Sequence, residues 1–412
     1  MHNRRVCITG MGVVSPIGIG VEKFAAGLRS GLSGIRSLQN DGNANLAPRV
    51  AGVVDIDFRD YLTPSKIQGP DRASLFALTA AQLAARDATN AEPLDLSAAG
   101  VYIGTGIGGI GALEAAYEEF FVRGGARIKP LSVVHAMNNA PAAHIAMEYG
   151  CHGPAMTYST ACSSSAIAIG EACRAIRHGY TSRALAGGAE AMLLPGIIRG
   201  WEALRTLAIV DAVNPPSSCL PFAKGRTGLV LAEGAAILML EEFEQARQRG
   251  ARIYAMLDGY GCRTDATHLT KPDATGQAAT MRAALADAGL QAHDIGYINA
   301  HGTATLAGDI IETEAIKLAF GDLAKEIPIS STKSMHGHAM GATGAMEFIA
   351  SVIALTHGFL PPTINLFEQD PECDLDYVPN QAREGVQLRH VMSNSFAFGG
   401  SNAVLIASKP GP

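Results

Sequence analysis

The chain is poor in aromatic and charged residues. Only 6% of its 412 residues are aromatic, with a single tryptophan, and 17% are charged. The formal net charge of −6 argues against a nucleic-acid-binding protein, because such proteins need a surplus of basic side chains. Aliphatic residues make up most of the 48% hydrophobic fraction, which is enough to fill a large core. The length predicts either two or three domain-sized units or one large duplicated α/β body.

The chain also lacks paired cysteines and long apolar runs. Its seven cysteines are odd in number and scattered, and they include no C-x-x-C pair. This pattern fits a reducing compartment and favours neither a disulfide scaffold nor a zinc site. The first residues lead into a glycine-broken strand, so we expect no signal peptide, and no apolar run is long enough to span a bilayer. Together these features predict a cytoplasmic location.

Two glycine-rich stretches resemble dinucleotide-binding fingerprints without completing one. In residues 10–15 the third glycine is replaced by Ser15. Residues 106–111 form a literal G-x-G-x-x-G between a predicted strand and a predicted helix, but the acidic residue expected about 20 positions later is missing. The sequence therefore disfavours dinucleotide binding. The alternative is a tight loop where the backbone passes close to another group.

One cysteine stands at a predicted strand-to-helix turn. Residues 157–160 are typical of a strand end, and apolar residues recur at helical spacing over 166–176. The helix is expected to end at His178 and Gly179. A thiol at Cys162 would face the positive end of the helix dipole and free backbone N–H groups, and both favour the thiolate. Cys162 is therefore a candidate nucleophile, and the alternative is a small buried cysteine that begins a core helix.

The chain contains a weak internal repeat. Each half has an early strand, at residues 5–9 and 253–257, and each half ends in an apolar strand. Cys162 precedes a helix that ends in His-Gly, and a turn in the second half precedes another helix with the same ending. We therefore predict two related α/β units, residues 1–250 and 251–412, whose strand-to-helix turns face each other. Open α/β sheets bind ligands at such turns, outside the carboxyl ends of their strands.

The second half supplies candidate partners for the cysteine. His301 follows a predicted strand, and Lys333 and His338 lie on the turn after another strand. A lone histidine is more often a satisfied polar residue, but two histidines at strand ends, together with a lysine and a turn cysteine, favour catalysis. A zinc site is disfavoured because the spacing is not H-E-x-x-H, and neither Asp309 nor Glu347 adds a recognisable ligand spacing. We therefore expect no metal.

A glycine-rich segment near the end of the chain completes an ordered set of motifs. This segment, residues 393–402, can present backbone N–H groups to an oxyanion and can also move. The motifs are TACSS at 160–164, NAHGT at 299–303, STKS at 331–334 with GH at 337–338, and SNSFAFGG at 393–400. Over essentially the whole chain, they resemble a β-ketoacyl-acyl-carrier-protein synthase of the synthase II, Cys-His-His type. The resemblance implies a thiolase-type α/β fold, duplicated in five layers (αβαβα). It also implies a homodimer, or a heterodimer with a related ketosynthase or chain-length-factor subunit.

The resemblance further implies decarboxylative Claisen condensation of an acyl-enzyme thioester with malonyl-acyl-carrier protein. Cys162 would take the acyl chain, and the backbone N–H groups of Cys162 and Phe398 would form the oxyanion hole. His301 and His338 would donate hydrogen bonds to the malonyl thioester oxygen as it becomes an enolate. The other implied residues are Lys333 and Glu347, which hold the constellation together, the structural acid Asp309, the pantetheine-binding hydroxyls of Thr303 and Thr305, and Phe398 as a substrate contact. No cofactor is implied beyond the phosphopantetheine of the carrier protein.

The sequence departs from the family pattern at several positions. Leu306 stands where the family commonly has proline, and Ala397 stands where it commonly has glycine. Ala397 is expected to stiffen the mobile loop and to restrict it if a positive φ is required. The serines after Cys162 are similar to those that polyketide synthases have at these positions. The residues Phe396, Ala397 and Trp201 are similar to those of nodulation-type and polyene-type synthases. Bacterial fatty-acid elongation and type II polyketide or polyene elongation therefore both stay open.

Two other protein classes are alternatives to this resemblance. Thiolases use a second cysteine and chalcone-type enzymes use a Cys-His-Asn set, so the paired His301 and His338 disfavour both. A non-catalytic or partner-dependent subunit similar to a chain-length factor is the remaining alternative. Such partners generally lack the nucleophile, and Cys162 argues against this reading.

Pocket and docking residues can also be suggested from the resemblance. Ile107 lies in the glycine loop that lines the acyl pocket of related enzymes, and Trp201 falls at an aromatic pocket position; core packing is the alternative for both. Carrier proteins are acidic and this chain is net negative, so we expect docking at a local basic patch. The candidates near the expected pocket mouth are Arg127, Lys129 and Arg205, and ordinary solvated charge is the alternative for each.

Overall fold

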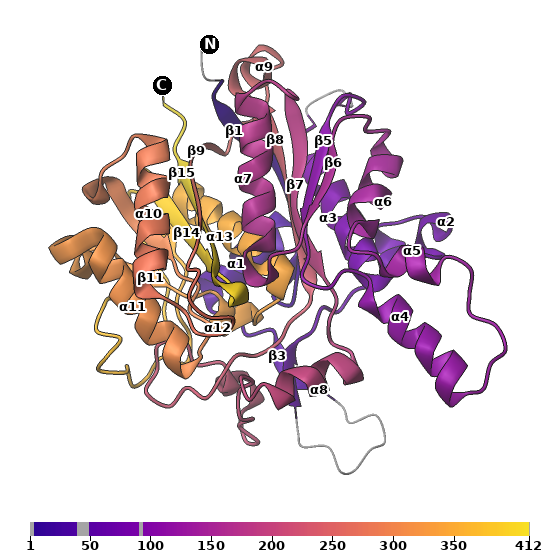
Figure 1. Cartoon of the computed structure of the whole chain (residues 1–412). Helices are drawn as coiled ribbons and strands as arrows, with labels where there is room; N and C mark the ends of the chain where they lie inside the picture. The colour runs from indigo at the N-terminus through magenta and orange to yellow at the C-terminus, as the bar shows by residue number, and fades with distance from the viewer. Residues whose placement is uncertain (1–3, 39–48, 90–93, 412) are drawn as a thin grey trace.

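The structure is organised around one mixed sheet made of two similar sets of strands (Figure 1). It is a computed structural model that describes residues 4–38, 49–89 and 94–411. In the first set the order is β1-β8-β7-β5-β6, where β8 runs antiparallel to both neighbours and β7, β5 and β6 run parallel. These strands are β1 (Val6–Ser15), β5 (Gly100–Gly104), β6 (Ala155–Tyr158), β7 (Arg183–Glu190) and β8 (Gly234–Glu242).

The second set repeats this arrangement strand for strand. Its order is β9-β15-β14-β10-β11, with β15 antiparallel to both neighbours and β14, β10 and β11 parallel. Its strands are β9 (Ala255–Thr264), β10 (Ile295–Asn299), β11 (Ile329–Ser330), β14 (His390–Phe396) and β15 (Ser401–Ser408). The sets join where β1 and β9 pair antiparallel over two residues of each strand. Because they form one continuous sheet, the predicted division of the chain at residue 250 stays a prediction.

Helices cover both sets and also fill the space between them, which produces the αβαβα layering (Figure 1). The helices of the central layer are α7 (Ser164–Arg177) and α13 (Thr343–His357). The outer helices are α3 (Arg72–Asp87) and α6 (Ala140–Tyr149) on the first set, and α10 (Ala274–Ala288) and α11 (Leu306–Phe320) on the second. The helices α7 and α13 therefore lie side by side in the core.

The composition of the central helices explains why they are buried. In α13 every residue from Thr343 to Leu355 is buried, as expected for a helix that is apolar on all sides. Small residues bring α7 and α13 close together, since a Cβ added to Gly344 would lie 3.1 Å from the Cβ of Ala166. The shortage of aromatic residues in the chain thus matches a core of closely packed small side chains.

The remaining elements are shorter. Residues 132–149 form two helices, α5 and α6, and not one continuous helix, because Met137 is extended and Pro141 lies in the first turn of α6. The described residues between 31 and 70 contain a strand pair, β3 and β4, and the short helices η1 and α2. The other elements are β2 (Gly18–Ile19), α1 (Val21–Ser30), β3 (Ile35–Leu38), β4 (Arg49–Gly52), η1 (Phe58–Asp60), α2 (Pro64–Ile67), α4 (Ile110–Tyr117), η2 (Glu118–Val122), α5 (Ser132–Ala136), η3 (Ala161–Ser163), α8 (Pro195–Ala203), η4 (Pro215–Ser218), α9 (Phe243–Gln248), η5 (Ala292–Asp294), η6 (Gly321–Lys325), α12 (Lys333–His336), η7 (Met340–Ala342), β12 (Phe359–Leu360), β13 (Arg383–Glu384) and η8 (Phe398–Gly400).

The excursion between β5 and β6 leaves a large apolar surface uncovered. It contains α4, η2 and α5, which extend away from the sheet in Figure 1. Its exposed apolar side chains, together with those of α6 and β6, are Tyr117, Phe120, Phe121, Val122, Ile128, Leu131, Val133, Val134, Met137, Met147 and Met156.

All seven cysteines are free. Within the described ranges, no helix combines the length and the apolar character needed to cross a membrane.

Candidate active site

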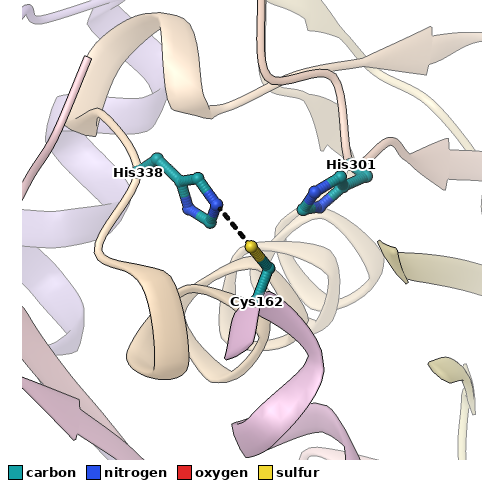
Figure 2. A group of neighbouring side chains, drawn as sticks. All are labelled: Cys162, His301 and His338. Carbon is teal, nitrogen blue, oxygen red and sulfur yellow. Dashed lines mark hydrogen bonds between the residues drawn. The ribbon is translucent and has the colours of Figure 1, made fainter. Parts of the chain in front are cut away.

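Residues from both halves meet at the carboxyl ends of the parallel strands. Cys162 lies in η3, between β6 and α7, and His301 follows β10. Lys333 begins α12 just after β11, and His338 follows two residues after that helix. Figure 2 shows Cys162 and the two histidines pointing into one common space. The fold therefore brings together motifs that are up to 176 residues apart in the chain.

The turn that carries Cys162 is held in an uncommon conformation by serine side chains. Ala161, just before it, has a φ of +50°, which lies in the left-handed region and is unfavourable for a residue with a Cβ. The hydroxyl of Ser164 donates to the Ala161 carbonyl at 2.6 Å and accepts the N–H of Thr160 at 2.8 Å. The hydroxyl of Ser163 donates to the Thr160 carbonyl at 2.9 Å. The serine run thus stabilises the turn that presents the thiol.

The thiol contacts one of the two histidines directly. The Sγ of Cys162 lies 3.0 Å from Nε2 of His338 and 3.7 Å from the Sδ of Met340. The rings of His301 and His338 are edge to face, with centroids 5.5 Å apart. Cys162, His301 and His338 each have one atom that could bind a metal, and these three atoms lie within 4.8 Å of one another. The three residues are therefore also a possible set of metal ligands. The ammonium of Lys333, 3.4 Å from Nδ1 of His301, opposes a second positive charge there.

Opposing influences act on the protonation state of the cysteine. Burial raises the pKa of the Cys162 thiol to about 11, whereas Lys333 and the backbone N–H groups of Phe398 and Cys162 lower it. The expected N–H groups are therefore in place, but desolvation outweighs them. Burial thus favours the thiol, whereas the N–H groups favour the thiolate. The thiol proton needs an acceptor, and His338 is at hydrogen-bond distance.

Both histidines are held neutral by their surroundings. Burial lowers the pKa of His301 and of His338 well below the ordinary value, and the charge of Lys333 is the second cause for each. An ammonium can only donate, so Nδ1 of His301 accepts from Lys333 and Nε2 carries the proton. Nδ1 of His338 lies 3.0 Å from the hydroxyl of Thr343, which can donate or accept. His338 can therefore carry its proton on either nitrogen.

Lys333 is fixed at the centre of this arrangement. Its Nζ donates to the Glu347 carboxylate and to the carbonyl oxygen of His301, both at 2.5 Å. Lys333 and Glu347 are both almost completely buried. Burial raises the pKa of Glu347, and the charge of Lys333 opposes this shift. Each group therefore needs the other, because either charge alone would be buried without a partner.

Two acids on the buried face of α11 shape the loop that carries His301. Asp309, predicted as a structural acid, accepts the N–H of Ala304 at 3.1 Å. Glu312, which the sequence analysis missed, accepts the N–H groups of His301 at 2.8 Å and of Gly302 at 2.7 Å. A second acid three residues after Asp309, on the same helix face, was the available signal. Together the two carboxylates hold the whole loop by its backbone.

A cavity of about 290 Å³ opens beside these residues. Its lining includes the predicted residues Cys162, Trp201, Arg205, His301, Thr303, Thr305, His338 and Phe398. The hydroxyl oxygens of Thr303 and Thr305 lie 3.0 Å apart and share a hydrogen bond. The Trp201 and Phe398 rings are stacked, with centroids 6.0 Å apart and an angle of 23° between their planes. The cavity thus joins the thiol to the two hydroxyls and to the aromatic pair.

Five predicted residues lie outside the lining of this cavity: the buried pair Lys333 and Glu347, described above, and Ile107, Arg127 and Lys129. Ile107 packs in the apolar cluster that contains Cys162. Arg127 and Lys129 lie in the exposed segment between η2 and α5, so Arg205 is the docking candidate that the structure places at the cavity. The glycine loop around Ile107 surrounds an internal carboxylate, since the N–H groups of Gly106 and Ile107 donate to Glu190.

The alanine in the C-terminal loop is not strained. Ala397 is extended, with φ −116° and ψ 153°. The left-handed conformations fall on the next two glycines, with φ 84° at Gly399 and 72° at Gly400. The condition for a restriction at Ala397, a positive φ, is therefore not met, because the positive φ values occur at the two glycines.

Comparisons with known proteins agree over the full length of the chain. Residues 3–246 match the model of the β-ketoacyl synthase N-terminal domain, and residues 254–367 match that of the C-terminal domain. The chain is 38% identical over 416 residues to a protein of Staphylococcus aureus (strain COL) named 3-oxoacyl-[acyl-carrier-protein] synthase 2, covering 99% of each chain. It is 43% identical over 404 residues to nodulation protein E of Rhizobium meliloti (strain 1021), covering 98% of each.

Solved structures show the same likeness. The structure named "The ishigamide ketosynthase/chain length factor" has a TM-score of 0.91 and 37% identity, covering 99% of this chain and 100% of that chain. The AntDE:AntF structure, a type II polyketide synthase acyl-carrier protein in complex with its ketosynthase bound to the hexaketide, has a TM-score of 0.91 and 34% identity at the same coverage. The predicted thiolase-type α/β fold is confirmed by these ketosynthase neighbours.

Proposed function

We propose that this chain, which belongs to the β-ketoacyl synthase family, condenses an acyl-enzyme thioester with malonyl-acyl-carrier protein in a decarboxylative Claisen reaction. One observation carries the proposal: a thiol, two neutral imidazoles and two backbone N–H groups converge on one cavity. The proposed pathway is chain elongation in bacterial fatty-acid or type II polyketide or polyene assembly. The proposal needs no resident cofactor, because phosphopantetheine arrives on the carrier protein.

The first step transfers the acyl chain to the cysteine. Nε2 of His338 accepts the thiol proton while the sulfur attacks the carrier thioester. The N–H groups of Cys162 and Phe398 stabilise the negative oxygen of the tetrahedral intermediate. The carrier thiolate then leaves and takes this proton from Nε2 of His338, which becomes neutral again. This step requires His338 to present Nε2 without a hydrogen.

The second step makes the new carbon–carbon bond. Loss of carbon dioxide from the malonyl unit leaves an enolate, whose oxygen accepts hydrogen bonds from Nε2 of His301 and His338. The enolate carbon attacks the acyl carbon, and Cys162 leaves as a thiolate that takes up the proton consumed in the overall reaction. His338 must now carry its proton on Nε2. The hydroxyl of Thr343 suits both steps, since it accepts from Nδ1 in the first and donates to it in the second.

A partner-dependent subunit similar to a chain-length factor is the second candidate function. It is suggested by the likeness to the ishigamide ketosynthase/chain length factor. The thiol of Cys162 within hydrogen-bond distance of a neutral histidine favours the catalytic reading. Acylation of Cys162 in the isolated chain distinguishes the two.

Two surfaces are proposed for partners. Arg205 lines the cavity together with Lys271, and this basic pair is the proposed docking place for an acidic carrier protein. Arg127 and Lys129 stay candidates from sequence. The exposed apolar surface of α4, η2, α5, α6 and β6 is the proposed contact with a second subunit, identical or related, because a surface of this kind is typical of an interface. A cytoplasmic location stays a prediction.

The proposed function is tested by incubating the purified chain with a panel of acyl-carrier thioesters. Intact mass spectrometry should show acylation of wild type and no acylation of Cys162→Ala. Addition of malonyl-acyl-carrier protein should release carbon dioxide and yield a β-ketoacyl product two carbons longer. Comparison of saturated and polyene acyl chains identifies the pathway. A chain that is acylated by no member of the panel, with or without a partner subunit, would contradict the proposal.

A further inference from the structure

A buried carboxylate outside the predicted catalytic set lies where the two halves of the site meet. Glu190 is the last residue of β7 and is completely buried. Its Oε2 accepts the N–H of Gly106 at 2.6 Å and the N–H of Gly341 at 2.9 Å. Its Oε1 accepts the N–H of Ile107 and the hydroxyl of Thr105, both at 3.3 Å. One side chain therefore holds two loops that belong to different halves of the chain.

The glycines in these loops are required by the carboxylate and by the closeness of the two backbones. A Cβ added to Gly106 would lie 2.8 Å from Oε2 of Glu190. A Cβ added to Gly341 would lie 2.4 Å from the backbone nitrogen of Gly106. The G-x-G-x-x-G stretch is thus an anion-binding loop, of the kind that often cradles phosphate, whose anion is supplied by the protein itself.

Each loop contributes to the surroundings of the thiol. The first loop carries Ile107, which packs in the apolar cluster of Cys162. The second is η7, which follows His338 and contains Met340, whose Sδ lies 3.7 Å from the Cys162 Sγ. A change in the separation of these loops would therefore move both the apolar wall beside the thiol and the turn of the second catalytic histidine.

We propose that Glu190 is a positioning residue that fixes the loop of Ile107 against the turn of His338 and so sets which acyl chains the enzyme accepts. The inference rests on the proposed function, because the acyl group is attached to Cys162. Glu190 acts through its neighbours, since its four described contacts are to backbone N–H groups and one hydroxyl. Glu190 affects the substrate by setting the shape of the space next to the thiol, where the acyl chain lies.

The charge of Glu190 has a second effect that can be measured separately. Burial raises the pKa of Glu190 to about 7, and its four hydrogen bonds oppose this rise. The negative charge of Glu190 in turn raises the pKa of Cys162. Replacing the carboxylate by an amide should therefore lower the pKa of the thiol, whether or not the enzyme has a substrate.

The test compares Glu190→Gln with wild type in the full chain. The amide must place its NH₂ group against at least one N–H donor, so at least one of the four contacts is lost. We expect kcat/KM for the longest acyl-carrier thioester to change about 10- to 100-fold relative to the shortest one, which is the scale of a lost hydrogen bond to a charged group. The pH at which the rate of Cys162 alkylation by iodoacetamide is half its maximum, the alkylation midpoint, should be lower than in wild type.

The matched control is Glu241→Gln. Glu241 is also completely buried and lies at the opposite end of the same strand pair, where it accepts a hydrogen bond from Thr9 at 2.6 Å. This substitution should leave the acyl-chain profile and the alkylation midpoint unchanged, even if it lowers the melting temperature. Glu190→Gln with the wild-type profile and midpoint, and only a lower melting temperature, would overturn the proposal.

A second variant keeps the proposal testable if Glu190→Gln does not fold. Gly106→Ala displaces the same carboxylate from the loop side and should shift the acyl-chain profile in the folded protein; an unchanged profile would refute the role of Glu190. If wild type condenses no acyl chain, the proposed function fails. The alkylation midpoint then still decides whether Glu190 acts on Cys162.

Discussion

The two halves of the chain use the same strand-to-helix turn for different chemistry. After β6 the turn presents Cys162 at the start of α7, and after β11 the turn presents Lys333 and His338 ahead of α13. The first turn directs the N–H of Cys162 at the sulfur. The second turn buries the Lys333 cation, which adds to burial in keeping the two imidazoles neutral. A duplicated frame therefore carries a nucleophile in one copy and hydrogen-bond donors in the other.

The difference shows how two reaction steps can be adjusted independently in one cavity. The copies touch through α7 and α13, where the N–H of Ala345 donates to the hydroxyl of Ser165 at 2.9 Å. This contact sets the distance between the turns, whereas the side chains around each turn set its protonation. The substitutions below change one copy at a time, and they are ordered from the largest expected effect to the smallest.

Cys162→Ala should abolish acyl-enzyme formation and condensation, because the nucleophile of the first turn is lost. Decarboxylation of malonyl-acyl-carrier protein should stay measurable, because His301 and His338 remain. Radiolabelled acyl transfer and carbon dioxide release, run separately on the folded variant, check this. Formation of any β-ketoacyl product by this variant would show that the nucleophile is another residue.

His338→Ala should lower condensation by about two to three orders of magnitude, the range seen when one donor to a developing oxyanion is removed. Acylation of Cys162 should persist but slow down, because the thiol loses its proton acceptor at 3.0 Å. Thr343→Val is the graded control and should slow both steps less. Equal losses of stability and of both partial reactions would instead indicate that His338 only packs the turn.

Lys333→Met should shift the acid limb of the acylation rate to higher pH. Lys333 is the second cause, after burial, of the low pKa of His338. Without this charge the pKa of His338 rises, so His338 is protonated, and unable to accept the thiol proton, at a higher pH than in wild type. The variant should also lose about 3–5 kcal/mol of unfolding free energy, because Glu347 is left buried without a partner.

The pH–rate profile and a denaturant titration provide these two measurements. Lys333→Arg is the matched control, since it keeps the charge while changing the shape of the donor. An acid limb that stays in place after Lys333→Met would contradict the electrostatic role assigned to the lysine.

Trp201→Ala should lengthen the acyl chains that are accepted and loosen Phe398, because the stacked pair is lost. Trp201 is only half-buried, so the loss of stability should be smaller than the roughly 3–5 kcal/mol of a fully buried tryptophan. Product profiles by mass spectrometry check the first effect, and Trp201→Phe should preserve most of the wild-type profile. If a folded Trp201→Ala protein has the wild-type product profile, Trp201 does not limit the length of the acyl chain.

Arg205→Glu should raise KM for carrier-bound substrates by about tenfold or less, as expected for an exposed charge pair. Small pantetheine thioesters should be unaffected, because they do not carry the acidic protein. Arg127→Glu is the comparison variant for a basic residue away from the cavity, and it should have the weaker effect. Equal losses on carrier-bound and small substrates would show that Arg205 affects the site and not docking.

Local features of the sequence predicted much of this site. The strand-to-helix turn at Cys162, the helix end at His178 and the strand before His301 all appear in the structure close to the expected positions. Each depends on neighbours a few residues away, where periodicity and capping signals operate. The ordered motifs of the second half likewise indicated the partners that the fold brings to the cysteine.

Contacts across the sheet were not predictable in the same way. Glu190 meets Gly341 over 151 residues, and nothing in the local spacing of either indicates the other. Glu312 was missed because its place three residues after Asp309 indicates a shared helix face but not the backbone N–H groups that it meets there. Local sequence shows the helix start, whose N–H groups favour the thiolate of Cys162, but not the extent of burial, which raises the pKa of the thiol.

The sequence by itself determined the alternation of strands and helices, the duplication and the residues that stand at strand ends. The tertiary structure alone decided the protonation of those residues and the backbone groups that hold them. The physical reason is that a pKa depends on desolvation and on charges from every element packed around a group. In this protein those elements come from both halves of the chain, so the chemistry of the site exists only once the halves are folded together.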